Sequence, residues 1–158
     1  MNHEGRLRGK HEGHEGPEGS EGSPERFRMR RPSPLDPEAD RMMTHTIGCA
    51  ISVHRALGPG FLESIYRKAM CVELEARGLA YEVERPVCVA YRGVDIPGQR
   101  IDLIVGGLIV VELKTVARFD RVHVAQLISY LKTTGLRGGL LINFRVPLLV
   151  KGLKRVVL

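Results

Sequence analysis

Residues 101–114 read IDLIVGGLIVVELK, and this stretch decides the fold class. Its apolar segments, which predict strands over 100–105 and 108–114, are separated by Gly106-Gly107. A glycine pair between two apolar segments is a strong signal for a β-hairpin, because glycine adopts the left-handed conformations that tight turns need. We therefore expect two adjacent apolar strands here.

Three charged side chains interrupt this otherwise apolar hairpin. Glu112 and Lys114 end the second strand, where side-chain alternation directs both to one face and Leu113 to the other. Asp102 lies within the first strand. Charges in such surroundings are costly unless they are paired or solvated, so the three point to a shared site. A purely structural ion pair at the sheet edge is the alternative.

The geometry of the turn decides whether Asp102 and Glu112 can meet. A strict two-residue turn at Gly106-Gly107 would leave the two carboxylates on opposite faces of the hairpin. A register shift of one residue, through a three-residue loop or a bulge, brings them to the same face. Because glycine suits such a bulge, we predict a bulged turn.

The segments around the hairpin predict an α/β domain. Apolar residues recur at helical spacing after Asp36, and Gly58-Pro59-Gly60 ends this first helix sharply. A second helix follows and ends at Gly78. Further strands are predicted at 81–91 (with an edge or bulge at Pro86), 136–144 and 153–158, and a helix at 122–132. The predicted order is α-α-β-β-β-α-β-β, a mixed β-sheet flanked by α-helices.

Residues 1–35 differ in composition from the rest of the chain. His-Glu-Gly occurs at 3–5, 11–13 and 14–16, and the segment has few apolar residues. Such a sequence cannot offset the entropy lost on ordering, so we expect a disordered low-complexity tail. The folded domain is expected over 36–158.

The charge is unevenly distributed along the chain. Residues 1–40 carry 7 basic and 9 acidic side chains, a net charge of −2, while residues 41–158 carry 17 basic and 9 acidic, a net charge of +8. A basic domain favours an anionic partner such as nucleic acid, although the same charge also keeps a small domain soluble.

Several protein classes are disfavoured by composition. The longest apolar run, 103–111, is interrupted by glycine and is far too short to span a membrane. Three cysteines without a CxxC pair indicate neither a disulfide framework nor a zinc ribbon. The chain does not open on a charged and then apolar leader. We therefore expect a cytoplasmic protein without a membrane segment.

Together these residues resemble a known family. Asp102, followed ten residues later by Glu112-x-Lys114, resembles the core of the PD-(D/E)xK nuclease superfamily. Residues 60–66, GFLESIY, resemble the GxxExxY signature that names one small bacterial and archaeal family within it. The stretches at 58–60, 126–130 and 141–144 are similar to that family too, and the likeness covers roughly residues 36–158.

The resemblance implies a restriction-endonuclease-like fold and metal-dependent hydrolysis of phosphodiester bonds, in DNA rather than RNA. Asp102, Glu112, the backbone carbonyl of Leu113 and Glu63 would hold Mg²⁺ or Mn²⁺, which prefer oxygen ligands. Lys114 would orient or deprotonate the attacking water. At the start of a helix, Glu63 also suits a simple N-terminal capping role.

Other polar residues are expected to support this site. Gln126 and Tyr130 lie four residues apart on one helix face and resemble the QxxxY element of exonuclease-type members of the superfamily, which makes Gln126 a candidate catalytic-site residue. We expect Tyr66, Tyr130, His123 and Arg100 to support the site or contact nucleic acid. For Tyr130, a half-buried core tyrosine is the alternative.

Two other functions stay open. A catalytically inactive nucleic-acid-binding or assembly module would keep the fold without turnover, but all the expected charged residues are present, and only Ile101 departs from the superfamily name, which has proline there. A structural protein stabilised by ion pairs would explain Lys114 but not the ordered set of motifs. The sequence also leaves a homodimer open.

Overall fold

The computed structural model describes residues 33–158, and residues 1–32 lie outside the described part of the chain. The predicted tail, 1–35, therefore falls almost entirely outside it. Leu35, the last residue of that predicted tail, is 6% exposed and packs in the core. The folded structure thus begins before the predicted boundary at residue 36.

The described chain forms three α-helices, one short 3₁₀ helix and five strands. In chain order they are α1 (Pro37–Leu57), α2 (Glu63–Ala76), β1 (Tyr81–Tyr91), β2 (Val94–Val105), β3 (Ile109–Lys114), α3 (Arg121–Thr134), β4 (Gly138–Asn143), η1 (Leu149–Gly152) and β5 (Leu153–Val157). The predicted fold class and element order are confirmed, and η1 is an addition. No helix of residues 33–158 has the length and apolar character needed to cross a membrane.

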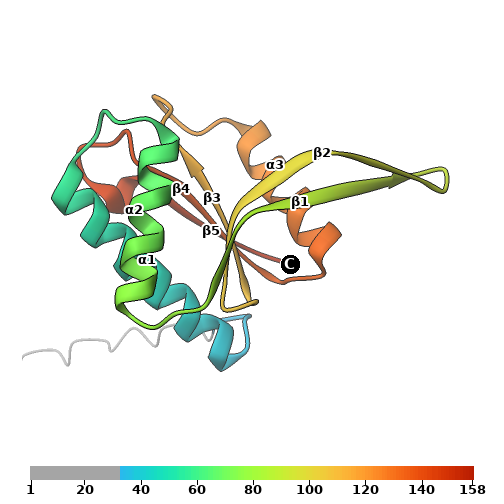
Figure 1. Ribbon diagram of the computed structural model, residues 1–158, viewed down its shortest axis with the longest axis horizontal. Coiled ribbons are helices and arrows are strands. Elements are labelled where there is room, and N and C mark those ends of the chain that lie inside the picture. Colours follow the sequence, from blue (N-terminus) through green and yellow to red (C-terminus); the bar gives the residue numbers. More distant parts are fainter. Residues whose placement is uncertain (1–32) are drawn as a thin grey trace, which may run out of the picture. The chain divides into compact units, whose positions relative to one another are not determined.

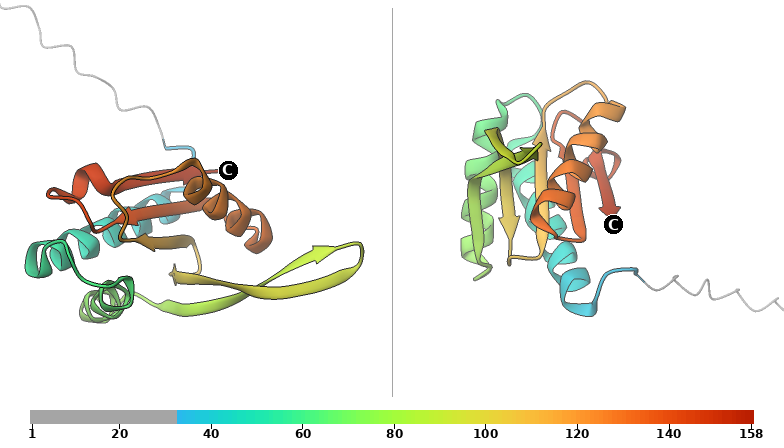
Figure 2. Two further views of the ribbon diagram at one scale, coloured as in Figure 1. Left: turned by 90° about the horizontal axis from the view of Figure 1, so that it is seen from above. Right: turned by 90° about the vertical axis from the view of Figure 1, so that its right-hand side faces the viewer.

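The strands of the described chain form one mixed sheet in the order β1-β2-β3-β4-β5. β3 and β4 run parallel, and the other neighbouring pairs run antiparallel. Helix α3 joins the parallel pair, because parallel strands need a crossover connection. Figure 1 shows α1 and α2 on one side of the sheet and α3 on the other, and Figure 2 shows the same layers from two further directions.

Successive side chains of β3 point to opposite faces of the sheet and pack into two separate apolar cores. Ile109, Val111 and Leu113 pack with α1 and α2, whereas Val110 packs with α3. A strand covered on both faces reads as a nearly continuous apolar run, which is what the sequence contains here. Glu112 is therefore an unusual residue for its position.

Local signals explain where the first two helices begin and end. The carboxylate of Asp36 caps α1 by accepting hydrogen bonds from the backbone N–H groups of Glu38 and Ala39, at 3.0 and 2.9 Å. Gly58 ends α1 with a φ of 67°, a conformation that favours glycine. The chain then turns at once into α2, so that Glu63 stands at the start of that helix.

The turn between β2 and β3 is a three-residue loop, residues 106–108. Val105 pairs with Ile109, and both glycines of the loop have left-handed φ values, 61° and 65°. The predicted one-residue register shift is therefore confirmed. Continuing the same register toward the other end of the hairpin brings Asp102 opposite Glu112.

β1 and β2 extend beyond the rest of the sheet as a two-stranded ribbon (Figure 1). Residues 88–100 of this ribbon are all exposed, and we call them the outer ribbon. The predicted start of the second strand at residue 100 was wrong, because β2 begins at Val94. The ribbon accommodates the dipeptide Pro97-Gly98 through a register shift between Val87 and Val89.

Candidate active site

The predicted acidic and basic side chains meet where β2, β3 and α2 come together. Asp102 belongs to β2, Glu112 and Lys114 belong to β3, and Glu63 is the first residue of α2. Asp102 and Glu112 are 9% and 3% exposed, although both carry ionisable side chains. The negative charge of Asp102 is one of the causes that raise the pKa values of Glu63, Glu112 and Lys114, so the four groups lie close together. The structure thus brings together four residues that the sequence placed on three separate elements.

Asp102 is held by two hydrogen bonds. Its Oδ2 accepts one from the backbone N–H of Leu113 at 2.9 Å, and its Oδ1 accepts one from Nη1 of Arg67 at 3.0 Å. The other terminal nitrogen of Arg67, Nη2, lies 3.3 Å from Oε1 of Glu84 on β1. Arg67 therefore bridges two carboxylates, which stabilises a nearly buried negative charge.

Sequence reasoning missed both Arg67 and Glu84. Arg67 follows Glu63 by four residues, so the two lie on the same face of α2, and this spacing was the available signal. Glu84 lies in a predicted strand, but its closeness to the site depends on how β1 pairs with β2. Neither residue could be linked to Asp102 without the tertiary structure.

Glu112 has one strong partner and one unpaired oxygen. Its Oε1 lies 2.7 Å from the Nζ of Lys114, while its Oε2 is buried without a hydrogen-bond partner. Burial raises the pKa of Glu112 to about 7, with the negative charges of Asp102 and Glu63 adding to the effect, although Lys114 opposes it. The fold therefore favours the protonated form of this carboxyl.

Lys114 stays positively charged in this site. Burial acts to lower the pKa of Lys114, but the hydrogen bond from its ammonium to Glu112 and the nearby carboxylates outweigh burial and raise it. An ammonium group donates hydrogen bonds and has no lone pair with which to accept a proton.

Glu63 faces the same cluster from α2. Burial raises the pKa of Glu63, the charge of Asp102 raises it further, and Lys114 and Arg67 act in the opposite direction. The N-cap of α2 is Leu62, whose side chain makes no capping hydrogen bond, and Glu63 is the acidic residue of the first turn. The alternative capping role of Glu63 stays a prediction.

Gln126 and Tyr130 of α3 form a polar chain that reaches β2. The Nε2 of Gln126 donates to the hydroxyl of Tyr130 at 2.9 Å, and this hydroxyl donates to the carbonyl of Arg100 at 3.1 Å. Burial raises the pKa of Tyr130, and the charge of Glu112 contributes, which places Tyr130 within electrostatic range of the site. Arg100 takes part in these hydrogen bonds only through its backbone carbonyl, and the residue is exposed.

The hydroxyl of Tyr66 bonds to the loop before α2 and not to the carboxylates. It donates to the carbonyl of Gly58 at 2.6 Å and accepts from the N–H of Phe61 at 3.2 Å. Its ring stacks on Phe144 with 4.3 Å between centroids. Tyr66 therefore fixes the loop before α2 and, through it, the position of Glu63.

His123 has a local structural contact. Its Nδ1 accepts a hydrogen bond from the backbone N–H of Asp120 at 3.0 Å, so it caps α3 together with Asp120. A contact between His123 and nucleic acid stays a prediction.

Asn143 anchors the loop that follows Lys114. In the sequence it stood out only as part of the stretch 141–144. Asn143 is 2% exposed. Its Nδ2 donates to the carbonyl of Val116 at 2.7 Å, and its Oδ1 accepts from the N–H groups of Val116 and Arg145, each at 3.1 Å. One buried amide therefore connects two loops beside the site.

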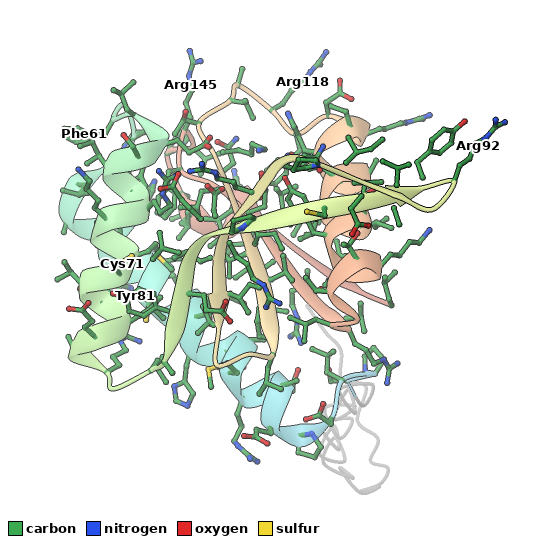
Figure 3. The ribbon with its side chains drawn as sticks, turned by 45° about the vertical axis from the view of Figure 1, so that its right-hand side comes forward. Phe61, Cys71, Tyr81, Arg92, Arg118 and Arg145 are labelled. Carbon is green, nitrogen blue, oxygen red and sulfur yellow. The ribbon has the colours of Figure 1, made fainter. Side chains whose placement is uncertain are left out.

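An open pocket of about 280 Å³ lies next to the strand end that carries Lys114. Thr115, the next residue, lines it together with Gly60, Phe61 and Arg145. Figure 3 shows the side chains of Arg145 and Arg118 extending outward from the same edge of the domain. This edge is therefore basic, which suits an anionic ligand.

The carboxylates are not arranged around a common point. No group of three or more His, Cys, Asp or Glu side chains placed to hold a metal ion occurs within residues 33–158. Asp102 is paired instead with Arg67, and Glu112 is paired with Lys114. The chemistry of these side chains nevertheless fits a divalent ion. Carboxylate oxygens are the ligands that Mg²⁺ prefers, and the buried Oε2 of Glu112 has no hydrogen-bond partner.

The mixed sheet flanked by helices, with an aspartate on one strand and Glu-x-Lys on the next, defines an α/β domain of the restriction-endonuclease type. A family model of the PD-(D/E)XK nuclease superfamily matches residues 40–156, and the chain therefore belongs to that superfamily. This membership supports a nuclease-like function, and enzymes of the superfamily generally use divalent metal ions. No curated protein and no solved structure gives a significant match.

Proposed function

We propose that this protein is a nuclease of the GxxExxY type that hydrolyses phosphodiester bonds of DNA with Mg²⁺ or Mn²⁺. The observation that carries the proposal is the Oε2 of Glu112, which is buried without a hydrogen-bond partner. Leaving a carboxylate oxygen in this state is costly. A cation bound between Glu112 and the neighbouring carboxylates would remove that cost.

In this proposal Asp102, Glu112, Glu63 and the backbone carbonyl of Leu113 hold the ion. When bound, the ion supplies Lewis-acid activation of the scissile phosphate and of the attacking water.

Lys114 orients the attacking water and stabilises negative charge that develops on the phosphate. In the alternative, Lys114 removes a proton from that water. Gln126 and Tyr130 support the site by tying α3 to β2 at the backbone of Arg100.

A nucleic acid is the expected substrate because the domain is strongly basic, and DNA rather than RNA is what the resemblance to the family implies. Residues 41–158 carry a net charge of +8. Arg145 lines the pocket next to Lys114, where a phosphate would be attracted to both positive groups. We place this catalytic domain within residues 33–158 and assign no role in cleavage to the residues before it.

The substitution Asp102→Asn tests this function, because it removes a negative charge and nearly preserves the side-chain shape. We expect it to abolish Mg²⁺-dependent cleavage of a labelled DNA fragment. DNA binding should persist or become tighter, because one source of repulsion toward phosphate is lost. The matched control Asp95→Asn makes the same change in the exposed part of the same strand and should cut like the wild type.

Lys114→Met separates the remaining alternatives. For an enzyme, it should also abolish cleavage and weaken DNA binding slightly. For an inactive binding module, the wild type itself would bind DNA without cutting it. For a purely structural ion pair, Asp102→Asn and Lys114→Met would each lose roughly 3–5 kcal/mol of stability. In that case neither Mg²⁺ nor Mn²⁺ would raise the melting temperature of the wild type. Cleavage of RNA but not DNA would contradict the proposed substrate.

A further inference from the structure

Arg67 occupies an unexpected place in the site, because it pairs with a residue proposed to bind metal. Its Nη1 lies 3.0 Å from Oδ1 of Asp102, and its Nη2 lies 3.3 Å from Oε1 of Glu84. The side chain of Asp102 is 11% exposed, whereas that of Glu84 is 46% exposed. The same guanidinium therefore contacts one carboxylate inside the site and one at its solvent-facing border.

Sheet pairing explains why an arginine stands between these carboxylates. Val83 pairs with Leu103 and Arg85 pairs with Ile101, so Glu84 lies opposite Asp102 at a position where the ladder is interrupted. Like charges directly opposite each other on neighbouring strands repel. The planar, forked guanidinium of arginine can neutralise both at once, which a lysine cannot do as well.

The backbone adapts to this arrangement. Glu84 has a φ of 49°, one of two positive φ values at non-glycine residues in the described chain. A non-glycine residue adopts this conformation only at a cost, and such positions are enriched at functional sites. Glu84 adopts this conformation within strand β1, with its carboxylate next to Arg67.

Asp102 already has a cationic partner, because the Nη1 of Arg67 lies 3.0 Å from its Oδ1. A divalent ion that binds Asp102 would therefore compete with the guanidinium for the same carboxylate and repel it. Glu84 offers Arg67 a second partner that is already within 3.3 Å.

We propose that Arg67 is an internal competitor of the divalent ion. Arg67 holds Asp102 while the site is without metal and shifts toward Glu84 when the ion binds, so the Arg67–Glu84 pair sets the metal affinity of the site. This inference rests on the proposed function, since it assumes that Asp102 is a metal ligand.

Binding of Mn²⁺, followed by isothermal titration calorimetry in the absence of DNA, tests the proposal with four proteins. Arg67→Gln should bind Mn²⁺ about tenfold more tightly than the wild type, because the competing charge is gone. Glu84→Gln should bind it about threefold more weakly, because Arg67 loses its alternative partner. In the double variant the effect of Glu84→Gln should disappear, which is the signature of a coupled pair.

Two further variants control for folding and for charge. Arg67→Lys keeps the charge but loses the fork, so its affinity should fall between those of the wild type and Arg67→Gln. Arg77→Gln removes the same charge from the other end of α2, where Arg77 bonds to Ser52 and the carbonyl of Gly48. It should leave Mn²⁺ affinity unchanged even if it lowers the melting temperature.

The possible results separate this inference from the proposed function. Equal Mn²⁺ affinity in all folded variants, or weaker binding by Arg67→Gln, would overturn the role of Arg67 and leave the metal site intact. Absence of Mn²⁺ binding in the wild type and in every variant would overturn the metal site and this inference together. A gain in affinity for both single variants would show that Arg67 and Glu84 do not act as a pair.

Discussion

The two halves of strand β2 share one backbone but lie in opposite surroundings. Residues 101–105 are all buried, packed between the helices on both faces of the sheet, whereas residues 94–100 are all exposed in the outer ribbon. The inner half carries the candidate catalytic Asp102. The outer half carries Asp95 and the apolar residues Val94 and Ile96, which are 62% and 50% exposed.

This difference shows that strand formation and burial are separate properties of a sequence. In the outer ribbon, Val89 pairs with Ile96 and Tyr91 pairs with Val94, and such cross-strand pairs stabilise a ribbon without a core. The inner half is stabilised by the helices that cover it. Where the sheet is covered, burial is the largest cause of the raised pKa of Glu112.

The largest expected contrast is between one apolar residue in each half. Ile104→Ala should cost about 2–5 kcal/mol, because it leaves a cavity in the core on the α3 side. Ile96→Ala should change stability by less than about 0.5 kcal/mol, because half of its side chain is already in water. Urea unfolding of both variants measures the difference. Similar losses would mean that the outer ribbon is covered in solution.

The next effect is the pH dependence of stability at Glu112. Its pKa is raised from 4.5 to about 7 in the fold, so the folded protein holds this proton more tightly than the unfolded chain does. This contribution to stability is fully present below about pH 4.5 and is lost as the pH rises through 7. Relative to the wild type, Glu112→Gln should therefore gain up to about 3 kcal/mol between pH 5 and pH 8.

Thermal melts of Glu112→Gln and the wild type across this range, without divalent ions, measure that gain. Asp95→Asn controls for the loss of a carboxylate from the exposed half of β2. A stability difference between Glu112→Gln and the wild type that stays constant from pH 5 to pH 8 would show that the pKa of Glu112 is not raised.

A smaller loss of stability is expected for Asn143→Ala. This variant tests whether the two loops beside the buried half of β2 depend on the Asn143 side chain. Three backbone groups of Val116 and Arg145 would lose their partner, at a cost of about 1–3 kcal/mol. Chemical denaturation measures this cost. If the stability does not change, water replaces the side chain, and the loops do not depend on Asn143.

The smallest effect is expected at the tip of the outer ribbon. Tyr91→Ala should leave the global stability within about 0.5 kcal/mol of the wild type. It should nevertheless speed hydrogen exchange of the ribbon amides, because a cross-strand pair contributes about 0.2–1 kcal/mol locally. A drop in melting temperature would show that the ribbon unfolds together with the core.

Much of the fold could be predicted from local patterns. Helical and alternating apolar spacings predicted every α-helix and strand of the described chain in the correct order, and the glycine pair predicted the shifted register of the hairpin. The exposed extension of β2 was missed, because Pro97-Gly98 is normally a sign of a turn. The shift in register that accommodates this dipeptide depends on the partner strand.

The candidate site divides in the same way. The sequence alone determined that Asp102, Glu112 and Lys114 belong to one hairpin and that Glu63 begins a helix, because these relations follow from spacings of a few residues. Only the tertiary structure decided that Arg67 pairs with Asp102, that Glu84 lies opposite it, and that Tyr66 bonds to a loop carbonyl. The physical reason is that contacts between distant residues depend on how helices pack on the sheet and how strands pair. Local periodicity does not encode either of these.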